Sequence, residues 1–238
     1  IVAEKSEMAL RMEHAGVSGG GAPGNDVAQT MDSAESPAPG WRDPVTGFWM
    51  REYLEERILP ELYDGAGKLR AEGPRFLFAA SIDRLRSINE VYGHDAGDAL
   101  MAAVAKKVAH TVNAAGMSAA NAIVRYEGNL FVGFLNGVQF ASVADTLNLM
   151  LSAIGAVTVE VKGDIVGPTS MSIGVYMERK GAEIGNSVRV AKALMEYASS
   201  KGGNNIGYVR NQDRVITGRD FSGRNALPEN LITLLHRR

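Results

Sequence analysis

The side chains of this sequence that could carry out chemistry are few and widely spaced. The 238 residues include no cysteine, which excludes a thiolate nucleophile, a Cys-ligated zinc or iron–sulfur site and a disulfide scaffold. The four histidines have no i,i+4 pairing and no acid at ligand spacing; they are His14, His94, His110 and His236. There is also no Ser-centred nucleophile elbow and no Walker-type phosphate loop. Thiol, serine-hydrolase and histidine-metal chemistry are therefore excluded.

Composition and charge narrow the class of protein further. Apolar residues make up 45% of the chain, and 25 basic against 27 acidic side chains give a formal net charge of −2. We expect no nucleic-acid partner, because such a chain has no overall basic field. No apolar run approaches the roughly 18 residues that a membrane helix needs. The first residues lack an initiator Met and a signal-peptide pattern, so we expect a cytoplasmic fragment of a longer protein.

The pattern along the chain divides it into four parts. Residues 1–15 are expected to form a short signalling helix, and residues 16–40, rich in Gly, Pro and Ser, a flexible linker. Residues 41–209 carry the apolar periodicity of one folded domain. Residues 210–238 hold six Arg against three acids, which predicts a basic tail that is a solvated linker or a docking segment.

The domain alternates between helical and strand patterns. The predicted helices are 49–62, 84–92, 97–113, 139–154 and 186–200, with a break at 93–97. The predicted strands are 76–82, the two around residues 127–129, 157–161, 169–177 and 206–209. This order predicts an α/β (α+β) sandwich with a central, mostly antiparallel mixed sheet that is flanked by helices and includes a hairpin.

Five ordered motifs resemble those of the GGDEF domain, the diguanylate cyclase domain with a nucleotidyl-cyclase-like fold. They are Asp-Pro-Val-Thr-Gly-Phe at 43–48, the Ser-Ile-Asp to Gly-Asp stretch at 81–98, the signature hairpin at 124–131, Ser-Ile-Gly-Val at 172–175 and the closing helix at 191–204. The resemblance implies condensation of two GTP into cyclic di-GMP by two facing domains. This is a phosphoryl transfer that needs carboxylates to hold divalent metal.

The positions that would supply these carboxylates hold other residues. Ser81 stands at one metal-binding acid of the family, Asn129 at the other, and Leu130 at the Glu with a catalytic role. Asp83 is retained, but the family's acid at that position is not a metal ligand. The signature is therefore degenerate, and it reads Glu127-Gly128-Asn129-Leu130-Phe131. We expect no catalytic residue, no metal site and no cofactor.

The nucleotide-binding positions differ as well. The family's phosphate-contacting Lys and Arg correspond to Ser199 and Gly203, and its Asp near the start of the closing helix corresponds to Lys192. The inhibitory Arg-x-x-Asp site reads Ser118-Ala-Ala-Asn121, so we expect that it does not bind product.

Asn89 and Asp98 do match the family's guanine-binding pair. They either retain guanine recognition or have structural roles, with Asn89 capping the turn before Gly93 and Asp98 at a helix N-terminus.

Three hypotheses of function follow from the resemblance. The first is a catalytically inactive regulatory or protein-interaction module in bacterial cyclic di-GMP signalling. Its partners would be other domains of the same protein, a separate protein or a second copy. The second is a sensor that binds a guanine nucleotide, GTP or cyclic di-GMP, without turning it over. The third is a residual diguanylate cyclase.

Overall fold

The computed structural model describes residues 39–70, 75–114, 123–136, 140–178, 180–211 and 214–217. All of them belong to one compact unit, Glu35–Arg238. The predicted helix at 1–15, nearly all of the predicted linker at 16–40 and the tail beyond residue 217 lie outside the described residues.

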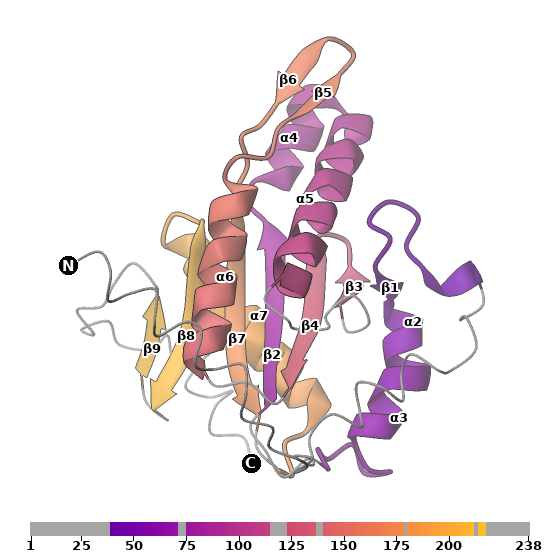
Figure 1. Ribbon diagram of the computed structural model, residues 1–238, viewed down its shortest axis with the longest axis vertical. Coiled ribbons are helices and arrows are strands. Elements are labelled where there is room, and N and C mark those ends of the chain that lie inside the picture. Colours follow the sequence, from indigo (N-terminus) through magenta and orange to yellow (C-terminus); the bar gives the residue numbers. More distant parts are fainter. Residues whose placement is uncertain are drawn as a thin grey trace, which may run out of the picture. The chain divides into compact units, whose positions relative to one another are not determined.

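A seven-stranded sheet forms the centre of the fold, in the order β1-β3-β4-β2-β7-β8-β9. Its strands are β1 (Trp49–Met50), β2 (Arg75–Ile82), β3 (Ile123–Glu127), β4 (Leu130–Asn136), β7 (Met171–Glu178), β8 (Asn205–Asn211) and β9 (Arg214–Thr217). The β1–β3 and β7–β8 pairs are parallel, and the other four are antiparallel. The predicted mostly antiparallel mixed sheet with a hairpin is confirmed (Figure 1).

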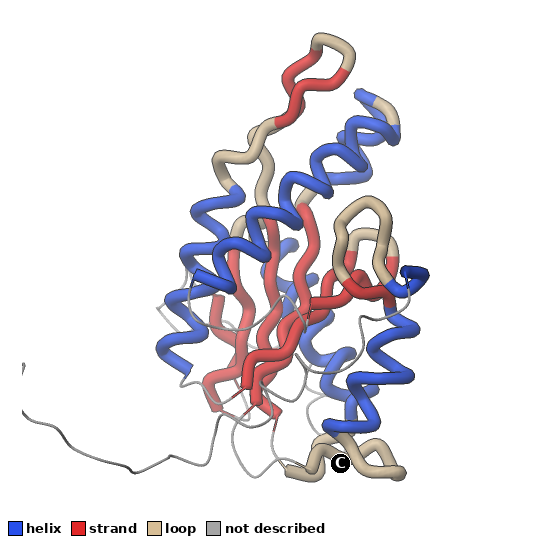
Figure 2. Tube along the Cα trace, turned by 45° about the vertical axis from the view of Figure 1, so that its right-hand side comes forward, coloured by secondary structure: helices blue, strands red, loops and turns tan. Residues whose placement is uncertain are grey.

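Helices cover both faces of the sheet (Figure 2). The remaining elements are η1 (Pro39–Trp41), α2 (Arg51–Tyr53), η2 (Leu54–Ile58, a π-helical turn), α3 (Leu59–Leu62), α4 (Leu85–Tyr92), α5 (His94–Ala114), α6 (Phe140–Ile154) and α7 (Ile184–Ser200), with a small hairpin of β5 (Val159–Val161) and β6 (Asp164–Val166). Among the described residues, no helix has both the length and the hydropathy to cross a membrane.

Alternation along β2 builds two apolar layers, because successive strand residues point to opposite faces. Phe76 and Phe78 pack in the layer that α5 and α6 cover. Leu77 and Ala79 pack in the opposite layer, against the segment α2–α3 and α7. Burial on both faces explains why the sequence of β2 reads as a continuous apolar run.

The second layer depends on a close approach of α7 to the sheet. A Cβ atom added at Gly174 of β7 would collide with the backbone of Ala191 and Met195, and one added at Gly207 of β8 would collide with the carbonyl of Leu194. Glycine at these two strand positions therefore lets the helix backbone lie directly on the sheet.

Two predicted helix boundaries are wrong. The helix predicted from residue 49 begins at Arg51, because Trp49 and Met50 pair with Val124 and Arg125 as strand β1. The break predicted at 93–97 is confined to Gly93, whose φ of 85° interrupts the helix, and α5 begins at His94.

The sequence prediction also missed two short strands. β6 completes a hairpin with β5, and β9 pairs with β8 through the register Tyr208–Ile216. The sheet therefore continues to Thr217, beyond the domain end expected at residue 209.

Candidate functional site

The chemically relevant positions meet at one end of the sheet, where β2 stops. Ser81, half-buried near the end of β2, has Leu130 of β4 and Ser172 of β7 as its cross-strand partners. The turn between β3 and β4 places Asn129 beside them. The fold thus brings together the positions that the resemblance assigned to metal binding and catalysis.

Asn129 closes this end of β2 with two hydrogen bonds. Its Nδ2 donates to the carbonyl oxygen of Ile82 at 2.7 Å, and its Oδ1 accepts from the amide of Ile82 at 3.1 Å. Because Ile82 offers one donor and one acceptor, the pair fixes the orientation of the amide. The N–H group of Asn129 therefore points at the Ile82 carbonyl oxygen. An N–H group has no lone pair with which to bind a cation.

Leu130 lies in an apolar environment. It is 5% exposed and belongs to the layer that contains Val132 of β4 and Val188 and Ala191 of α7. A leucine neither ligates a metal nor transfers a proton. The position that the resemblance assigned to a catalytic Glu thus contributes to the packing of α7 on the sheet.

Asp83, just beyond β2, is held by neutral donors. Its carboxylate accepts hydrogen bonds from Ser172 at 2.6 Å, Ser170 at 2.6 Å and the backbone amide of Asn204 at 2.8 Å. Ser199 adds a longer contact of 3.4 Å. In the part of the chain that the structure describes, no Lys or Arg pairs with this carboxylate. Asp83 therefore ties the end of β2 to the start of β7 and to the α7–β8 loop.

These donors and acceptors do not fit the metal centre that the resemblance implies. Mg²⁺ prefers hard anionic oxygens, whereas Ser81 and Asn129 are neutral and the Asn129 nitrogen already faces Ile82. Among the described residues, no cluster of three or more His, Asp or Glu side chains could hold a metal. We therefore assign no metal-dependent step to this site.

The first residue of the signature forms an ion pair with α7. Glu127 Oε1 lies 2.5 Å from Lys192 Nζ, and their side chains are 51% and 40% exposed. The hydrogen bond and the charge of Lys192 lower the pKa of Glu127, and the same hydrogen bond raises the pKa of Lys192. The pair links the hairpin to the helix beside the candidate site.

The expected phosphate-binding positions carry no cation. Ser199 is the last residue but one of α7, and Gly203 follows in a loop with φ of 71°. A Cβ atom at Gly203 would lie 2.6 Å from Asp83 Oδ2, so this loop packs directly on the carboxylate. The nearby Lys201 instead places its Nζ 5.2 Å from the ring centroid of Tyr197.

Asn89 and Asp98 lie on neighbouring helices, α4 and α5. Asn89 Oδ1 is buried against Gly97, where an added Cβ would collide with it, and finds no hydrogen-bond partner among the described residues. Asp98 is exposed.

Neither structural alternative for this pair matches the geometry. The turn at Gly93 is closed by the backbone carbonyl of Asn89, at 2.9 Å, and not by its side chain. Asp98 is the fifth residue of α5 and thus lies beyond its first turn.

Sequence reasoning missed the contact that braces the hairpin. Arg125 donates to Asp43 at 2.7 Å and to the carbonyl of Gly128 at 2.9 Å. Burial opposes ionisation of Asp43, but hydrogen bonds from Thr46 and the contact with Arg125 hold its pKa below the usual value. The opposite charges of Arg125 and Asp43 were the only feature of the sequence that could have indicated this contact, and 82 residues separate them.

The expected inhibitory positions Ser118 and Asn121 lie outside the described residues.

Comparison with known proteins gives one family. The family described as "Diguanylate cyclase, GGDEF domain" matches residues 41–205. A sequence relative, the diguanylate cyclase DgcP of Pseudomonas aeruginosa, is 29% identical over 147 residues, which are 61% of this chain and 20% of that protein. The chain thus spans about one fifth of this curated relative's length.

Solved structures share the fold at lower identity. Diguanylate cyclase SiaD of P. aeruginosa, in complex with its activator SiaC, has a TM-score of 0.63 and 21% identity, over 87% of this chain and 70% of that one. The FimX GGDEF domain of P. aeruginosa has a TM-score of 0.61 and 21% identity, over 71% and 99% of the two chains. The GGDEF domain of DgcB from Caulobacter crescentus, in complex with c-di-GMP, has a TM-score of 0.59 and 20% identity, over 71% and 95%.

Proposed function

Because this chain belongs to the GGDEF domain family of diguanylate cyclases, we propose that it is a catalytically inactive member that acts as a regulatory or protein-interaction module in cyclic di-GMP signalling. The observation that carries the proposal is the Asn129 amide, which donates to Ile82 at the point where the family needs a metal-binding carboxylate. The buried Leu130 supports it, because an apolar side chain there offers no proton acceptor.

The retained fold supports a role in interaction. The side chains at the end of β2 form a hydrogen-bonded network around Asp83 and Asn129, while the apolar layers are complete on both faces of the sheet. The SiaD–SiaC complex is a precedent for a domain of this fold with a protein partner. The partner would be another domain of the same polypeptide, a separate protein or a second copy, and the cytoplasmic location stays part of this proposal.

A turnover assay tests the proposed inactivity. The protein is incubated with GTP and Mg²⁺ or Mn²⁺, and cyclic di-GMP and pyrophosphate are quantified by chromatography. We expect no product above that of a heat-denatured sample. Formation of cyclic di-GMP that scales with protein concentration would overturn the proposal, and Ser81→Ala would then show whether this hydroxyl holds the metal.

A second candidate function is a guanine-nucleotide sensor, and one observation favours it. Asn89 Oδ1 is buried without a partner among the described residues, and Asp98 is exposed on the adjacent helix. An amide and a carboxylate together match the hydrogen-bonding edge of guanine. Such a site would bind GTP or cyclic di-GMP without turning it over.

Calorimetry with GTP, GDP and cyclic di-GMP separates the two functions. Micromolar binding that is lost in Asp98→Ala and kept in the matched control Asp145→Ala, on α6, would establish the sensor. Absence of binding to all three nucleotides would leave the interaction module as the function. Binding that Asp98→Ala leaves unchanged would place the nucleotide elsewhere.

A further inference from the structure

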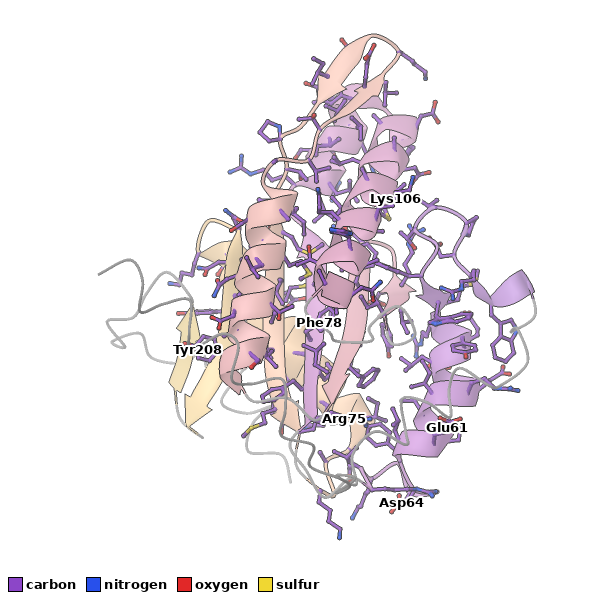
Figure 3. All side chains as sticks on the ribbon, viewed as in Figure 1. Glu61, Asp64, Arg75, Phe78, Lys106 and Tyr208 are labelled. Atoms are coloured by element: carbon purple, nitrogen blue, oxygen red, sulfur yellow. The ribbon has the colours of Figure 1, made fainter. Side chains whose placement is uncertain are left out.

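A buried polar contact lies at the end of the sheet opposite the candidate site. The Tyr63 hydroxyl donates to the Glu178 carboxylate, with distances of 2.8 and 2.9 Å to its two oxygens. Tyr63 is 2% exposed and Glu178 0%. Arg75, the cross-strand partner of Glu178, is 3% exposed and is labelled at the lower end of β2 in Figure 3. We call the Tyr63–Glu178 pair the basal contact.

The basal contact holds the turn after α3 against the end of β7, next to the loop that leads into α7. After Tyr63 the chain folds back, and its backbone pairs with the loop that leads into α7. Leu69 donates to Ala182 at 2.9 Å, Gly181 donates to Leu69 at 3.0 Å, and Lys68 and Glu183 form an isolated bridge. The first residues of α7 are thus held by the chain segment that follows α3.

The segment α2–α3, residues 51–62, connects this turn with the signature hairpin. Its buried residues Leu54 and Ile58 pack in the same apolar layer as Leu130. At its beginning, the Arg51 guanidinium lies 4.6 Å from the ring centroid of Tyr126, which immediately precedes the hairpin turn. One short helical segment therefore contacts α7 at one end and the hairpin strand at the other.

The ion pair of Glu127 with Lys192 adds a direct contact between the hairpin and α7. It joins the hairpin to the middle of α7. Backbone hydrogen bonds of Gly67 and Leu69 join the start of α7 to the turn after α3, and the basal contact holds that turn against the end of β7. The two links differ in strength, since the ion pair is half-exposed while the basal contact is a buried hydrogen bond. The basal contact is therefore the stronger of the two, and it acts on α7 through the turn after α3.

We propose that the basal contact is a positioning element: Tyr63 and Glu178 set the position of α7 on the sheet and, through Lys192, the position of the hairpin turn at residues 127–130. The glycine contacts of α7 transmit such a displacement, because the helix backbone touches β7 and β8 without intervening side chains. This positioning role holds whether or not the domain binds or turns over a nucleotide.

Amide hydrogen exchange of Tyr63→Phe tests the proposal. The substitution removes the Tyr63 hydrogen bond to Glu178 and so loosens the turn after α3, whose backbone holds the start of α7. We expect exchange at least about fivefold faster in peptides that cover residues 184–192 and 127–130, as removal of a buried hydrogen bond predicts. Glu178→Gln keeps an acceptor for Tyr63 and should give a smaller increase.

Two controls define the outcomes. Tyr92→Phe makes the same chemical change on the exposed end of α4 and should leave exchange at the hairpin unchanged. Val112→Ala destabilises the opposite apolar layer, and it should not accelerate exchange in 127–130 selectively. The proposal is overturned if Tyr63→Phe accelerates exchange only in residues 63–69 and 181–184. It is also overturned if Val112→Ala produces the same pattern at α7 and the hairpin.

Discussion

Glu127 and Lys192 form an ion pair of 2.5 Å between the β3–β4 hairpin and α7. The resemblance to GGDEF domains implies Gly at the first of these positions and Asp at the second. In this chain an acid and a base stand at these two positions, and their charges are complementary. The hairpin and α7 are thereby fastened beside the candidate site.

Lys192→Met should lower the free energy of unfolding by less than about 1 kcal/mol, because both side chains are substantially exposed. Addition of Glu127→Gln should cost little more, since the partner is already lost. Chemical denaturation of the two single variants and the double variant measures this. In 1 M NaCl the difference should shrink; a difference that does not depend on salt would contradict an electrostatic contact.

Asp43→Asn should flatten the pH dependence of stability in the acidic range. The pKa of Asp43 is lower in the folded protein than its unfolded value of about 3.9. Its contribution is therefore complete above that value and is lost as the pH falls through the folded pKa. Urea denaturation should show the variant less stable than the wild type at pH 7, with a difference that narrows as the pH falls below about 4. A difference that stays constant as the pH falls would exclude this linkage.

Gly174→Ala should destabilise the protein by about 1–3 kcal/mol, because the added methyl group overlaps the backbone of Ala191 and Met195. Gly185→Ala, in the first turn of α7, is the matched control. Nothing lies within 4 Å of an added Cβ there, so it should be neutral or slightly stabilising. Thermal unfolding of both variants checks the prediction. Equal unfolding midpoints for the two variants would contradict the close contact between the α7 backbone and Gly174.

Leu130→Glu, which restores the family's residue, should destabilise the domain by several kcal/mol at pH 7, because it buries a carboxylate without a partner. The loss should be smaller near pH 4, where the acid is protonated. Leu149→Glu on α6, where the side chain is 62% exposed, should have little effect. Unfolding curves at both pH values test this. A stable Leu130→Glu variant at pH 7 would mean that the side chain reaches solvent.

Asn129→Asp should cost about 1–3 kcal/mol at neutral pH, because an ionised carboxylate would replace the Nδ2 donor to the Ile82 carbonyl. Protonation restores a donor, so the variant should recover part of this loss in acid. Denaturation at pH 7 and pH 4 measures the difference. An increase in stability of the variant with Mg²⁺ but not with Na⁺ at equal ionic strength would show that a metal reaches this position.

The sequence predicted the central elements well, because each pattern reflects a physical requirement of the fold. Examples are the apolar run Phe76–Ile82 and the glycine of the Ser-Ile-Gly motif. The first is buried on both faces, and the second lets α7 approach. The strands β6 and β9 were missed because three or four residues at an edge carry little periodicity.

The sequence did not indicate the contacts that the site residues make. Local sequence showed that Asn129 is not an acid, yet only the fold brings its amide to Ile82, 47 residues away. Asp43 with Arg125 and Tyr63 with Glu178 are separated by 82 and 115 residues. Such pairs depend on tertiary packing, which no single-sequence pattern specifies.

Strand β9 changes the direction in which the chain leaves the sheet. β8 runs away from the end that holds Asp83, and a chain that left from β8 would depart at the far side. Because β9 is antiparallel to β8 and Thr217 is opposite Gly207, the last described residue lies back toward the end of the sheet where the amide of Asn204 meets Asp83.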